Sequence, residues 1–522
     1  MAALASATLL PAGTQAATLS TFGPTGDGPQ GIALDSSGNV FTTNFTTDDV
    51  SKLLPGGGAA GAPWPIAAPD PWNAAVDDAG NVFASNANFN SVSKITAAGA
   101  LAGAPWPAGT GTVPLGITTD QAGNFYTANA GGDSVTKVTP GGVATLFANT
   151  GAGSSPYALA FDLDGNLYTA NNGTDTVSKF TPSGTPAGAP WPVSLGAGAN
   201  PWGITVDSAG NVYTANDNID TVSRITAAGT LTSFNVGFNP RAATVDSAGN
   251  VYVINTGSAS VSKITAAGAV TVSFVSAGGL NSPSGVSIDS LGNLFVNNFS
   301  DDTVSKISPS GGDIQPAPPD TPSTPTATAG KEAVVVTVPA NPTDRRYGVP
   351  SSYLVTAVEA PSRGCTVTPP ATSCEVTGLT AGTAYTFTAR AKLNTWQTPA
   401  STASAPVTPL APPVPTPTVT VMAPKVKVTK NSVLVTSKVK VSGAGKIAQR
   451  ATTGKGKKTK TWCRASKSAA KAGTYTLNCN LGKRGRSALR KAALKLTLRT
   501  TFTPTAGEAI TANRKLNLKR KR

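Results

Sequence analysis

Histidine is absent from the 522-residue sequence, the first glutamate is Glu332, and the first cysteine is Cys365. Acid–base catalysis near neutral pH depends mainly on His or on a carboxylate with a shifted pKa, and a nucleophilic Ser or Cys needs a base beside it. We therefore assign no catalytic residue, no metal site and no cofactor. A Ser–Lys pair and an Asp-based calcium site are the alternatives that the remaining residue types leave open.

Long hydrophobic runs are also missing. No stretch of about 18 apolar residues follows the N-terminus, so the sequence predicts no transmembrane segment. Residues 1–16 end in small residues, like the cleavage site of a signal peptide, but contain no Lys or Arg. We interpret them as a signal peptide remnant, with a disordered leader as the alternative.

Charged residues make up only 13% of the chain, while Gly 55 and Pro 41 indicate many tight turns and short strands. This composition favours an all-β fold. The charge is unevenly distributed, with a net of −12 over residues 1–313, +1 over 314–423 and +26 over 424–522. The basic character therefore belongs to the C-terminal region alone.

A repeated phrase dominates the N-terminal region, and PWGITVDSAGNVYTANDNIDTVSRITAAG at 201–229 is a representative copy. Seven copies follow one another at intervals of 39 to 45 residues, which is the length of a four-stranded propeller blade. Each copy contains one aspartate at the same place, which we call the marker Asp. The marker residues are Asp35, Asp77, Asp120, Asp162, Asp207, Asp246 and Asp289.

Each copy reads as a short strand, a tight turn with Gly and Asn, a second strand and a third strand. Fourth strands are expected at 143–147, 231–234 and 271–274. The seventh copy has none, but ATLSTF at 17–22 resembles one. We therefore predict a seven-bladed β-propeller whose last blade is completed by the N-terminal strand, which removes the open sheet edges.

The GI.VD..GNVY and VSKIT phrases resemble those of NHL-repeat and streptogramin-lyase-like propellers over residues 17–311. The resemblance implies two enzyme classes. The streptogramin lyases use a His, an acidic residue and a divalent metal, and the gluconolactonase-like hydrolases hold a metal with Glu, Asn and Asp. Neither set can be placed on this propeller, because it contains no His and no Glu.

A variable position stands directly after the proline that precedes each marker Asp by six residues. Because the strand it enters should be the innermost of its blade, these side chains should surround one mouth of the central channel. We predict a ligand-binding platform there for a glycan, a peptide or a small aromatic molecule, with a plug of packed side chains as the alternative. The predicted binding residues are Gln30, Trp72, Tyr157, Trp202 and Arg241.

Other features that occur once per blade are better explained by structure. The marker Asp residues should hold turn amides. The basic residues of the third strands should be solvated or paired with Asp175 and Asp220. Trp64, Trp106 and Trp191, in three GAPWP segments, should pack on outer strands or their loops.

The rest of the chain predicts two β-sandwich-like domains. Residues 320–410 resemble a fibronectin type III module through CEVTGLTAGTAYTFTARA, in which Tyr385 matches the tyrosine corner and Leu379 the core. Residues 424–522 show period-two strands with exposed Lys and resemble the basic tails of secreted actinobacterial proteins. Because the four cysteines occur as two close pairs, we predict two disulfides, Cys365 with Cys374 and Cys463 with Cys479.

The predicted organisation is a signal peptide remnant, the propeller, a Pro-rich linker, the fibronectin-like domain, a second linker and the basic domain: 1–16, 17–313, 314–319, 320–410, 411–423 and 424–522. We predict an extracellular, cell-wall-associated binding or scaffold protein, anchored by an anionic cell-wall polymer at its basic tail. Few aromatic residues there disfavour nucleic acid, and charge for solubility alone is the simpler alternative. A lyase or hydrolase and a purely structural envelope protein remain as other functions.

Overall fold

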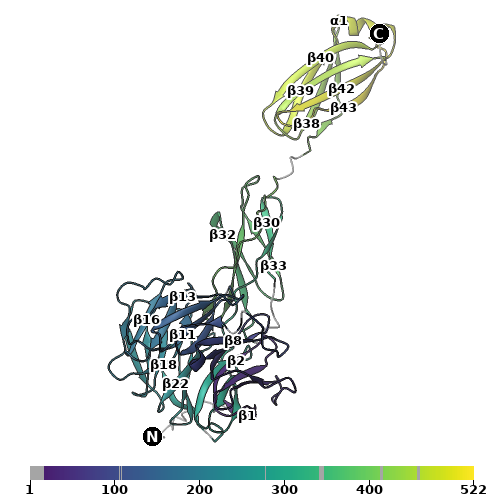
Figure 1. The fold of residues 1–522 in the computed structure, drawn as a ribbon. Helices are drawn as coiled ribbons and strands as arrows, with labels where there is room; N and C mark the ends of the chain where they lie inside the picture. The colour runs from purple at the N-terminus through teal and green to yellow at the C-terminus, as the bar shows by residue number, and fades with distance from the viewer. Residues whose placement is uncertain are drawn as a thin grey trace, which may run out of the picture. The chain divides into compact units, whose positions relative to one another are not determined.

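The computed structural model describes residues 17–104, 106, 108–120, 122–276, 278–339, 346–411, 416–454 and 459–521. The signal peptide prediction for 1–16 lies outside these residues. The chain divides into two compact units, residues 1–410 and 411–522, both built mainly of β-strands (Figure 1). Within the described residues, no helix has the length and apolarity needed to cross a membrane.

Seven four-stranded antiparallel sheets form the blades of a propeller. The innermost strand of each blade contacts the innermost strands of the two neighbouring blades, and β2 contacts β26, so the ring is closed. The innermost strands are β2 (Pro29–Leu34), β6 (Pro71–Val76), β10 (Pro114–Thr119), β14 (Pro156–Phe161), β18 (Pro201–Val206), β22 (Pro240–Val245) and β26 (Pro283–Ile288).

The second strands are buried at every residue, because both faces of each sheet are covered by the neighbouring blades. They are β3 (Val40–Asn44), β7 (Val82–Asn86), β11 (Phe125–Asn129), β15 (Leu167–Asn171), β19 (Val212–Asn216), β23 (Val251–Asn255) and β27 (Leu294–Asn298). The third strands are β4 (Asp49–Leu53), β8 (Ser91–Ile95), β12 (Ser134–Val138), β16 (Thr176–Phe180), β20 (Thr221–Ile225), β24 (Ser260–Ile264) and β28 (Thr303–Ser308).

The outer strands vary most, and those that follow a GAPWP segment are only two residues long. They are β5 (Ile66–Ala67), β9 (Ala108–Gly109), β13 (Ala144–Asn149), β17 (Val193–Ser194), β21 (Leu231–Asn235) and β25 (Val270–Val275). A short 3-10 helix, η1 (Ala87–Phe89), follows β7. The indole of Trp191 packs on Tyr168 with ring centroids 5.2 Å apart, and Trp64 and Trp106 pack in the same way on Phe41 and Phe83.

The N-terminal strand β1 (Thr18–Pro24) is the outer strand of the seventh blade. It pairs antiparallel with β28, with Leu19 opposite Ile307. Phe22 of β1 packs edge-on against Phe295 of β27 at 5.0 Å. The predicted closure of the ring by the N-terminal strand is therefore confirmed.

The marker Asp residues organise the turns between first and second strands, as predicted. Asp207 Oδ1 accepts hydrogen bonds from the backbone N–H groups of Ala209 and Asn211, at 2.9 Å each. Its Oδ2 accepts from the Asn211 side chain at 2.7 Å and from the Tyr213 hydroxyl at 3.2 Å. Every oxygen of this carboxylate thus has a structural partner.

The basic residues of the third strands were expected to be solvated or to pair with nearby Asp such as Asp175 and Asp220. The structure gives a different Asp partner, because Lys137 and Lys179 pair with the marker residues Asp120 and Asp162. Lys179 lies over the ring of Tyr168, with Nζ 5.1 Å from its centroid, and 3.8 Å from the carboxylate of marker Asp162. Asp175 instead accepts backbone N–H groups of the next loop. The six third-strand lysines each cover an aromatic ring of the second strand with their long side chains, and Arg224 covers Phe234 of the outer strand. These contacts depend on pairing between strands, so the sequence of a single strand does not reveal them.

The second part of this unit is a two-sheet β-sandwich with a shared core that includes Leu379 and Tyr385. One sheet contains β29 (Thr326–Ala329), β30 (Ala333–Thr337) and β33 (Ser373–Thr377). The other contains β31 (Ser352–Ala357), β32 (Ala360–Val367), β34 (Phe387–Leu393) and β35 (Trp396–Gln397). The Cys365–Cys374 disulfide joins β32 to β33 and so links the two sheets. The Tyr385 hydroxyl accepts the Thr380 N–H at 3.2 Å, as a tyrosine corner does.

Residues 314–319, expected to form a stiff linker, lie against the propeller instead. Ile314 and Ala317 are buried in a cluster shared with the sixth and seventh blades. The N–H of Ala317 bonds the carbonyl of Asp289, and Trp396 of the sandwich is buried among residues of the fifth and sixth blades. This segment packs against the propeller because it contains the apolar residues Ile314 and Ala317 in addition to its prolines.

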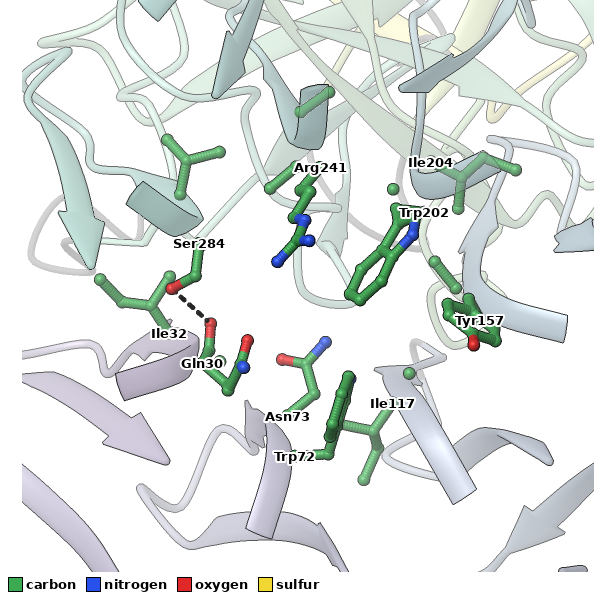
Figure 2. A pocket seen from close by; sticks show the side chains of 18 of the residues that line it. Gln30, Ile32, Trp72, Asn73, Ile117, Tyr157, Trp202, Ile204, Arg241 and Ser284 are labelled. Atoms are coloured by element: carbon green, nitrogen blue, oxygen red, sulfur yellow. Dashed lines mark hydrogen bonds between the residues drawn. The ribbon is translucent and has the colours of Figure 1, made fainter. Parts of the chain in front are cut away.

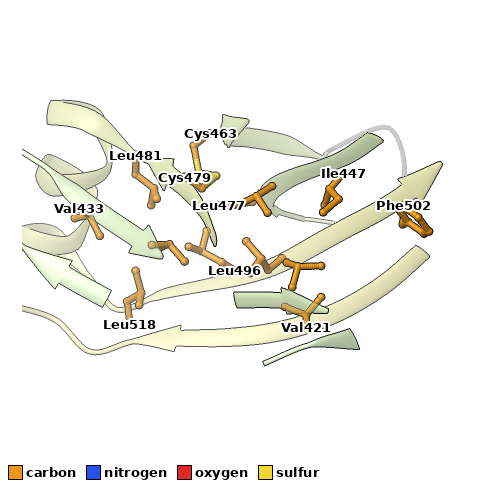
Figure 3. Packing of buried hydrophobic residues seen from close by; sticks show 14 of the residues in the cluster. Val421, Val433, Ile447, Cys463, Leu477, Cys479, Leu481, Leu496, Phe502 and Leu518 are labelled. Atoms are coloured by element: carbon orange, nitrogen blue, oxygen red, sulfur yellow. A yellow bond between two sulfur atoms is a disulfide. The ribbon is translucent and has the colours of Figure 1, made fainter. Parts of the chain in front are cut away.

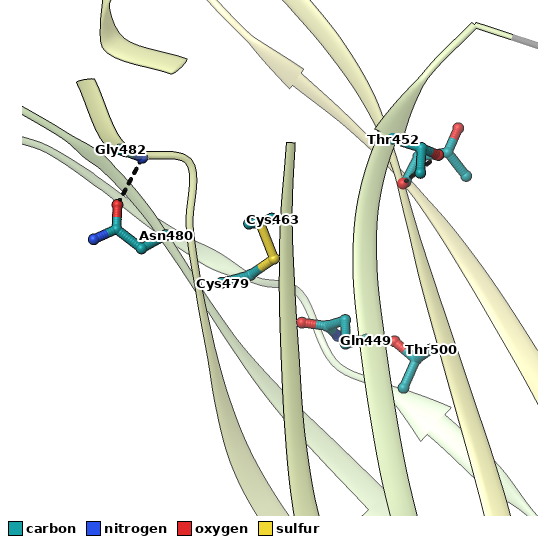
Figure 4. The surroundings of a disulfide bond; sticks show 8 residues. Gln449, Thr452, Cys463, Cys479, Asn480, Gly482 and Thr500 are labelled. Carbon is teal, nitrogen blue, oxygen red and sulfur yellow. Dashed lines mark hydrogen bonds between the residues drawn. A yellow bond between two sulfur atoms is a disulfide. The ribbon is translucent and has the colours of Figure 1, made fainter. Parts of the chain in front are cut away.

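The C-terminal unit is a second sandwich, whose core includes Ile447, Leu496 and Phe502 (Figure 3). One sheet contains β36 (Val419–Val421), β37 (Lys425–Val428), β38 (Val433–Val441) and β41 (Gly473–Asn480). The other contains β40 (Lys460–Ala469), β39 (Gly445–Thr453), β42 (Leu494–Pro504) and β43 (Ile510–Leu518), in that order. The Cys463–Cys479 disulfide connects the two sheets (Figure 4). A helix that the sequence did not predict, α1 (Gly482–Lys491), follows β41.

Candidate functional site

The variable residues after the strand-initial prolines lie at β-bulges. In the fifth blade Pro201 pairs with Asn216 and Gly203 with Ala215, so Trp202 is an extra residue without a direct partner. The same shift occurs at Trp72, Tyr157 and Arg241. A bulge redirects the side chain of the extra residue. These bulges direct the variable side chains toward the channel.

The residue after each bulge is small because the innermost strands approach one another closely. A Cβ on Gly203 would lie 2.5 Å from the carbonyl oxygen of Arg241 in the next blade. A Cβ on Gly116 would lie 2.6 Å from the carbonyl oxygen of Tyr157. The innermost strands therefore approach one another closely near the axis, and this approach fixes the positions of the backbone from which the bulged side chains extend.

Aromatic rings from three blades meet at this end of the channel (Figure 2). The ring centroids of Trp72 and Trp202 are 6.2 Å apart, and Tyr157 meets Trp202 edge-on at 5.1 Å. Arg241 places its Cζ 4.4 Å from the Trp202 centroid. Its Nε donates a hydrogen bond to Asp217 Oδ1 at 3.2 Å, which helps to hold the guanidinium over the indole.

A cavity of about 260 Å³ remains beside these rings, so they narrow the channel mouth without filling it. Figure 2 shows the Arg241 guanidinium and the Asn73 amide pointing into the space bordered by Trp72 and Trp202. Asn73 Oδ1 accepts the Ala74 N–H at 2.8 Å, and the Ser284 hydroxyl donates to the Pro29 carbonyl at 2.6 Å. The Asn73 amide nitrogen and the Arg241 guanidinium are therefore left as hydrogen-bond donors beside the aromatic rings.

The cavity does not fit a divalent metal. Its lining side chains supply amides, hydroxyls, indoles and one guanidinium, with no carboxylate and no imidazole. Among the described residues, no three His, Cys, Asp or Glu side chains lie close enough together to hold a metal ion. The guanidinium of Arg241 would also repel a cation.

All five residues predicted to bind a ligand, Gln30, Trp72, Tyr157, Trp202 and Arg241, line this cavity. Leu115 holds the equivalent position in the third blade but is not part of the lining. Sequence reasoning missed Asn73 and Asp217 as parts of this site. Asn73 could have been noticed in the sequence, because the equivalent position of every other blade, two residues after the proline, holds Gly or Ala. Asp217 belongs to a loop, and only the fold brings it to Arg241.

The fold and this site define a seven-bladed propeller with an aromatic cavity at one end of its channel. The model of the virginiamycin B lyase family matches residues 17–329. Because the match covers more than half of the chain, the chain belongs to the virginiamycin B lyase family. This confirms the propeller resemblance seen in the sequence and places the chain in a family named for an enzyme.

The chain is also similar to solved structures. A streptogramin B lyase structure is 20% identical, with a TM-score of 0.50, and the match covers 56% of this chain and 98% of that chain. Virginiamycin B lyase from Staphylococcus aureus is 19% identical, with a TM-score of 0.49, over 56% of this chain and 99% of that chain. At these identities the likeness shows the fold alone. A search of curated proteins found no match.

Proposed function

We propose that the protein is an exported binding protein of the cell envelope, in which the propeller cavity takes a small ligand and the basic C-terminal unit is the anchor. The observation that carries the proposal is the cavity itself. Independent bulges in four blades bring Trp72, Tyr157, Trp202 and Arg241 to one space. Packing alone does not require two indoles and a stacked guanidinium around an open volume.

The size and chemistry of the cavity limit the ligand. Its volume of about 260 Å³ lies just below the usual range of about 300–1,000 Å³ for small-molecule sites. Flat indole faces suit a sugar ring or an aromatic group, and the donors of Arg241 and Asn73 suit acceptor oxygens. We propose a single sugar residue, a peptide side chain or a small aromatic group as the bound moiety.

The proposed location in the cell envelope rests on the disulfides and on the charge of the C-terminal unit. Two disulfides link sheets within the two sandwiches, and such bonds persist in oxidising compartments. The net charge of +26 over residues 424–522 would attract an anionic polymer of the cell wall. We also propose that residues 320–410 are a fibronectin type III domain and that this domain serves as a spacer.

The test is binding of the full chain to an array of glycans, peptides and wall fragments. We expect Trp72→Ala and Trp202→Ala each to lose about 5- to 150-fold in affinity, since a stacked aromatic ligand contact contributes roughly 1–3 kcal/mol. Trp64→Ala removes an indole of the same size from the outer part of the first blade, where Trp64 packs on Phe41, and is the matched control. Binding that ignores both cavity variants, or no binding at all, would favour a purely structural envelope protein.

A lyase is the second candidate, because the chain belongs to the virginiamycin B lyase family. Against it, the His and metal-binding acid implied by the family resemblance have no counterpart in the cavity. Incubation of the full chain with virginiamycin B, with and without added Mg²⁺, decides between the two. Metal-dependent loss of the intact antibiotic, followed by mass spectrometry, would replace the binding proposal by the lyase.

A further inference from the structure

Three arginines lie side by side on the exposed face of the sheet β40-β39-β42-β43. The strand register places Arg450 of β39 directly opposite Arg464 of β40 on one side and Arg499 of β42 on the other. All three side chains are exposed. With neighbouring strands roughly 4.8 Å apart, the row spans about 10 Å.

The opposite sheet of the same unit arranges its cations differently. Lys438 of β38 lies opposite Thr476, and Lys440 lies between Thr420 and Thr474. Lys425 of β37 also faces a threonine, Thr436. Across neighbouring strands these three lysines face neutral residues, although Lys438 and Lys440 lie two positions apart on the same strand. Direct opposition of cations on adjacent strands is therefore a feature of the Arg row and not of these lysines.

The Arg row is electrostatically unfavourable without a partner. Like charges directly opposite one another on adjacent strands destabilise a sheet. The only acidic residue in 424–522 is Glu508, which lies between β42 and β43, and within the described residues no ion pair joins it to the row. The same face also carries Lys446, Lys495 and Lys515. An external anion bound to this face would relieve the repulsion.

The chemistry of the face favours phosphate without bases. Arginine matches phosphate oxygens with two parallel hydrogen bonds and stays charged at all relevant pH values. The neutral neighbours of the row are Ala, Ser, Thr and Asn, which offer no platform for base stacking. Trp462, on the same strand as Arg464, is already covered by Lys460 and Arg484, at 4.8 Å and 5.4 Å from its ring.

We infer that Arg464, Arg450 and Arg499 form the binding face for a linear phosphodiester polymer without bases. This rests on the proposed role of the C-terminal unit as an anchor and assigns that role to one face. The polymer runs across the strands, and successive phosphates contact successive arginines. Lys446, Lys495 and Lys515 extend the contact on either side of the row.

The experiment compares two variants of the full chain that lose the same charge. Arg450→Gln/Arg464→Gln/Arg499→Gln removes the row, and Lys425→Gln/Lys438→Gln/Lys440→Gln removes three cations from the opposite sheet. The probe is poly(glycerol phosphate), titrated at several salt concentrations. The Arg variant should lose about 100-fold in affinity at 0.1 M salt, and its log K against log salt slope should become shallower by about 2. The Lys variant should lose less than about fivefold.

Each other outcome overturns a defined part of the inference. Equal losses of affinity in both variants would mean that the C-terminal unit binds polyanions through its overall charge, and would contradict a specific role for the Arg row. Failure of the unaltered chain to bind the probe even at low salt would contradict both the proposed anchor role and the proposed binding face. Equal affinity for polyglutamate, or tighter Arg-dependent binding of a single-stranded oligonucleotide, would replace the phosphodiester by carboxylate or nucleic acid.

A measurement without ligand tests the electrostatic premise. Arg450→Gln removes the middle charge and should raise the Tm of the C-terminal transition by at least about 2 °C at low salt. The increase should disappear at high salt, where the repulsion is screened. An unchanged or lower Tm at low salt would show that the row is not repulsive and would overturn the reasoning.

Discussion

Gly203 offers a direct test of how closely the blades meet beside the cavity. A Cβ at this position would lie 2.5 Å from the carbonyl oxygen of Arg241 and 3.0 Å from the Cα of Ala242. An ordinary contact needs about 1 Å more, and both obstacles are backbone atoms that cannot rotate away. Because the ring is closed, the fifth and sixth blades cannot separate without straining the other interfaces. We expect Gly203→Ala to cost about 1–3 kcal/mol.

The assay is thermal unfolding of the full chain followed by tryptophan fluorescence, with Gly188→Ala as control. A Cβ on Gly188 meets nothing within 4 Å, so this change should be neutral or slightly stabilising. For a domain of this size Tm falls by about 2–4 °C for each kcal/mol. Gly203→Ala should also weaken ligand binding, because Trp202 and Arg241 flank the altered contact. Equal Tm values for the two variants would refute the inferred close approach.

Two further predictions concern the buried tyrosines of the second strands and the marker Asp residues in the turns before them. Burial, reinforced by Asp207, raises the pKa of Tyr213 to about 12, and the pKa values of Tyr126, Tyr168 and Tyr252 are raised further in the same way. These folded-state pKa values exceed the pKa of a tyrosine in the unfolded chain. The contribution of the four tyrosines to stability is therefore complete below about pH 10 and is lost as the pH rises through the folded-state values. An ultraviolet titration in which all 9 tyrosines ionise together near their ordinary pKa, while the protein stays folded, would contradict this prediction. Asp246→Ala should lower the free energy of unfolding, measured by chemical denaturation, by about 3 kcal/mol or more. The reason is that the buried Asp246 carboxylate accepts hydrogen bonds from four residues, which are Ala248, Asn250, Tyr252 and Gln315. Asp77→Ala should have a smaller effect, because among the described residues the Asp77 carboxylate accepts hydrogen bonds only from Asn81.

The propeller could be predicted from the sequence because its signals are local and repeated. The turn chemistry around each marker Asp fixes a hairpin within a few residues, and seven copies multiply that evidence. The strand that closes the ring was found because Thr18–Pro24 resembles the outer strands of other blades. The candidate site followed from one variable position next to a fixed proline.

The features that were missed depend on contacts between distant segments. The bulge that turns Trp202 toward the axis is a property of pairing between two strands, which composition does not report. The packing of Ile314 and Ala317 depends on apolar residues of the sixth and seventh blades, most of which are distant in the sequence. The opposition of Arg450, Arg464 and Arg499 depends on register across three strands. Helix α1 contains two glycines, so helix propensity gave no reason to expect it.

The pairing of β1 with β28 also sets the order in which the protein can assemble. Ser20 and Lys306, which are hydrogen-bonded across this pair, are 286 positions apart in the chain. The first six blades can form from neighbouring segments as they are synthesised, but the seventh needs both ends of the propeller at once. Until Ser308 has been made, the exposed edge of β1 is available to pair wrongly. The slow step in folding should therefore be the joining of the two ends, and chaperones that protect β1 would act in that interval.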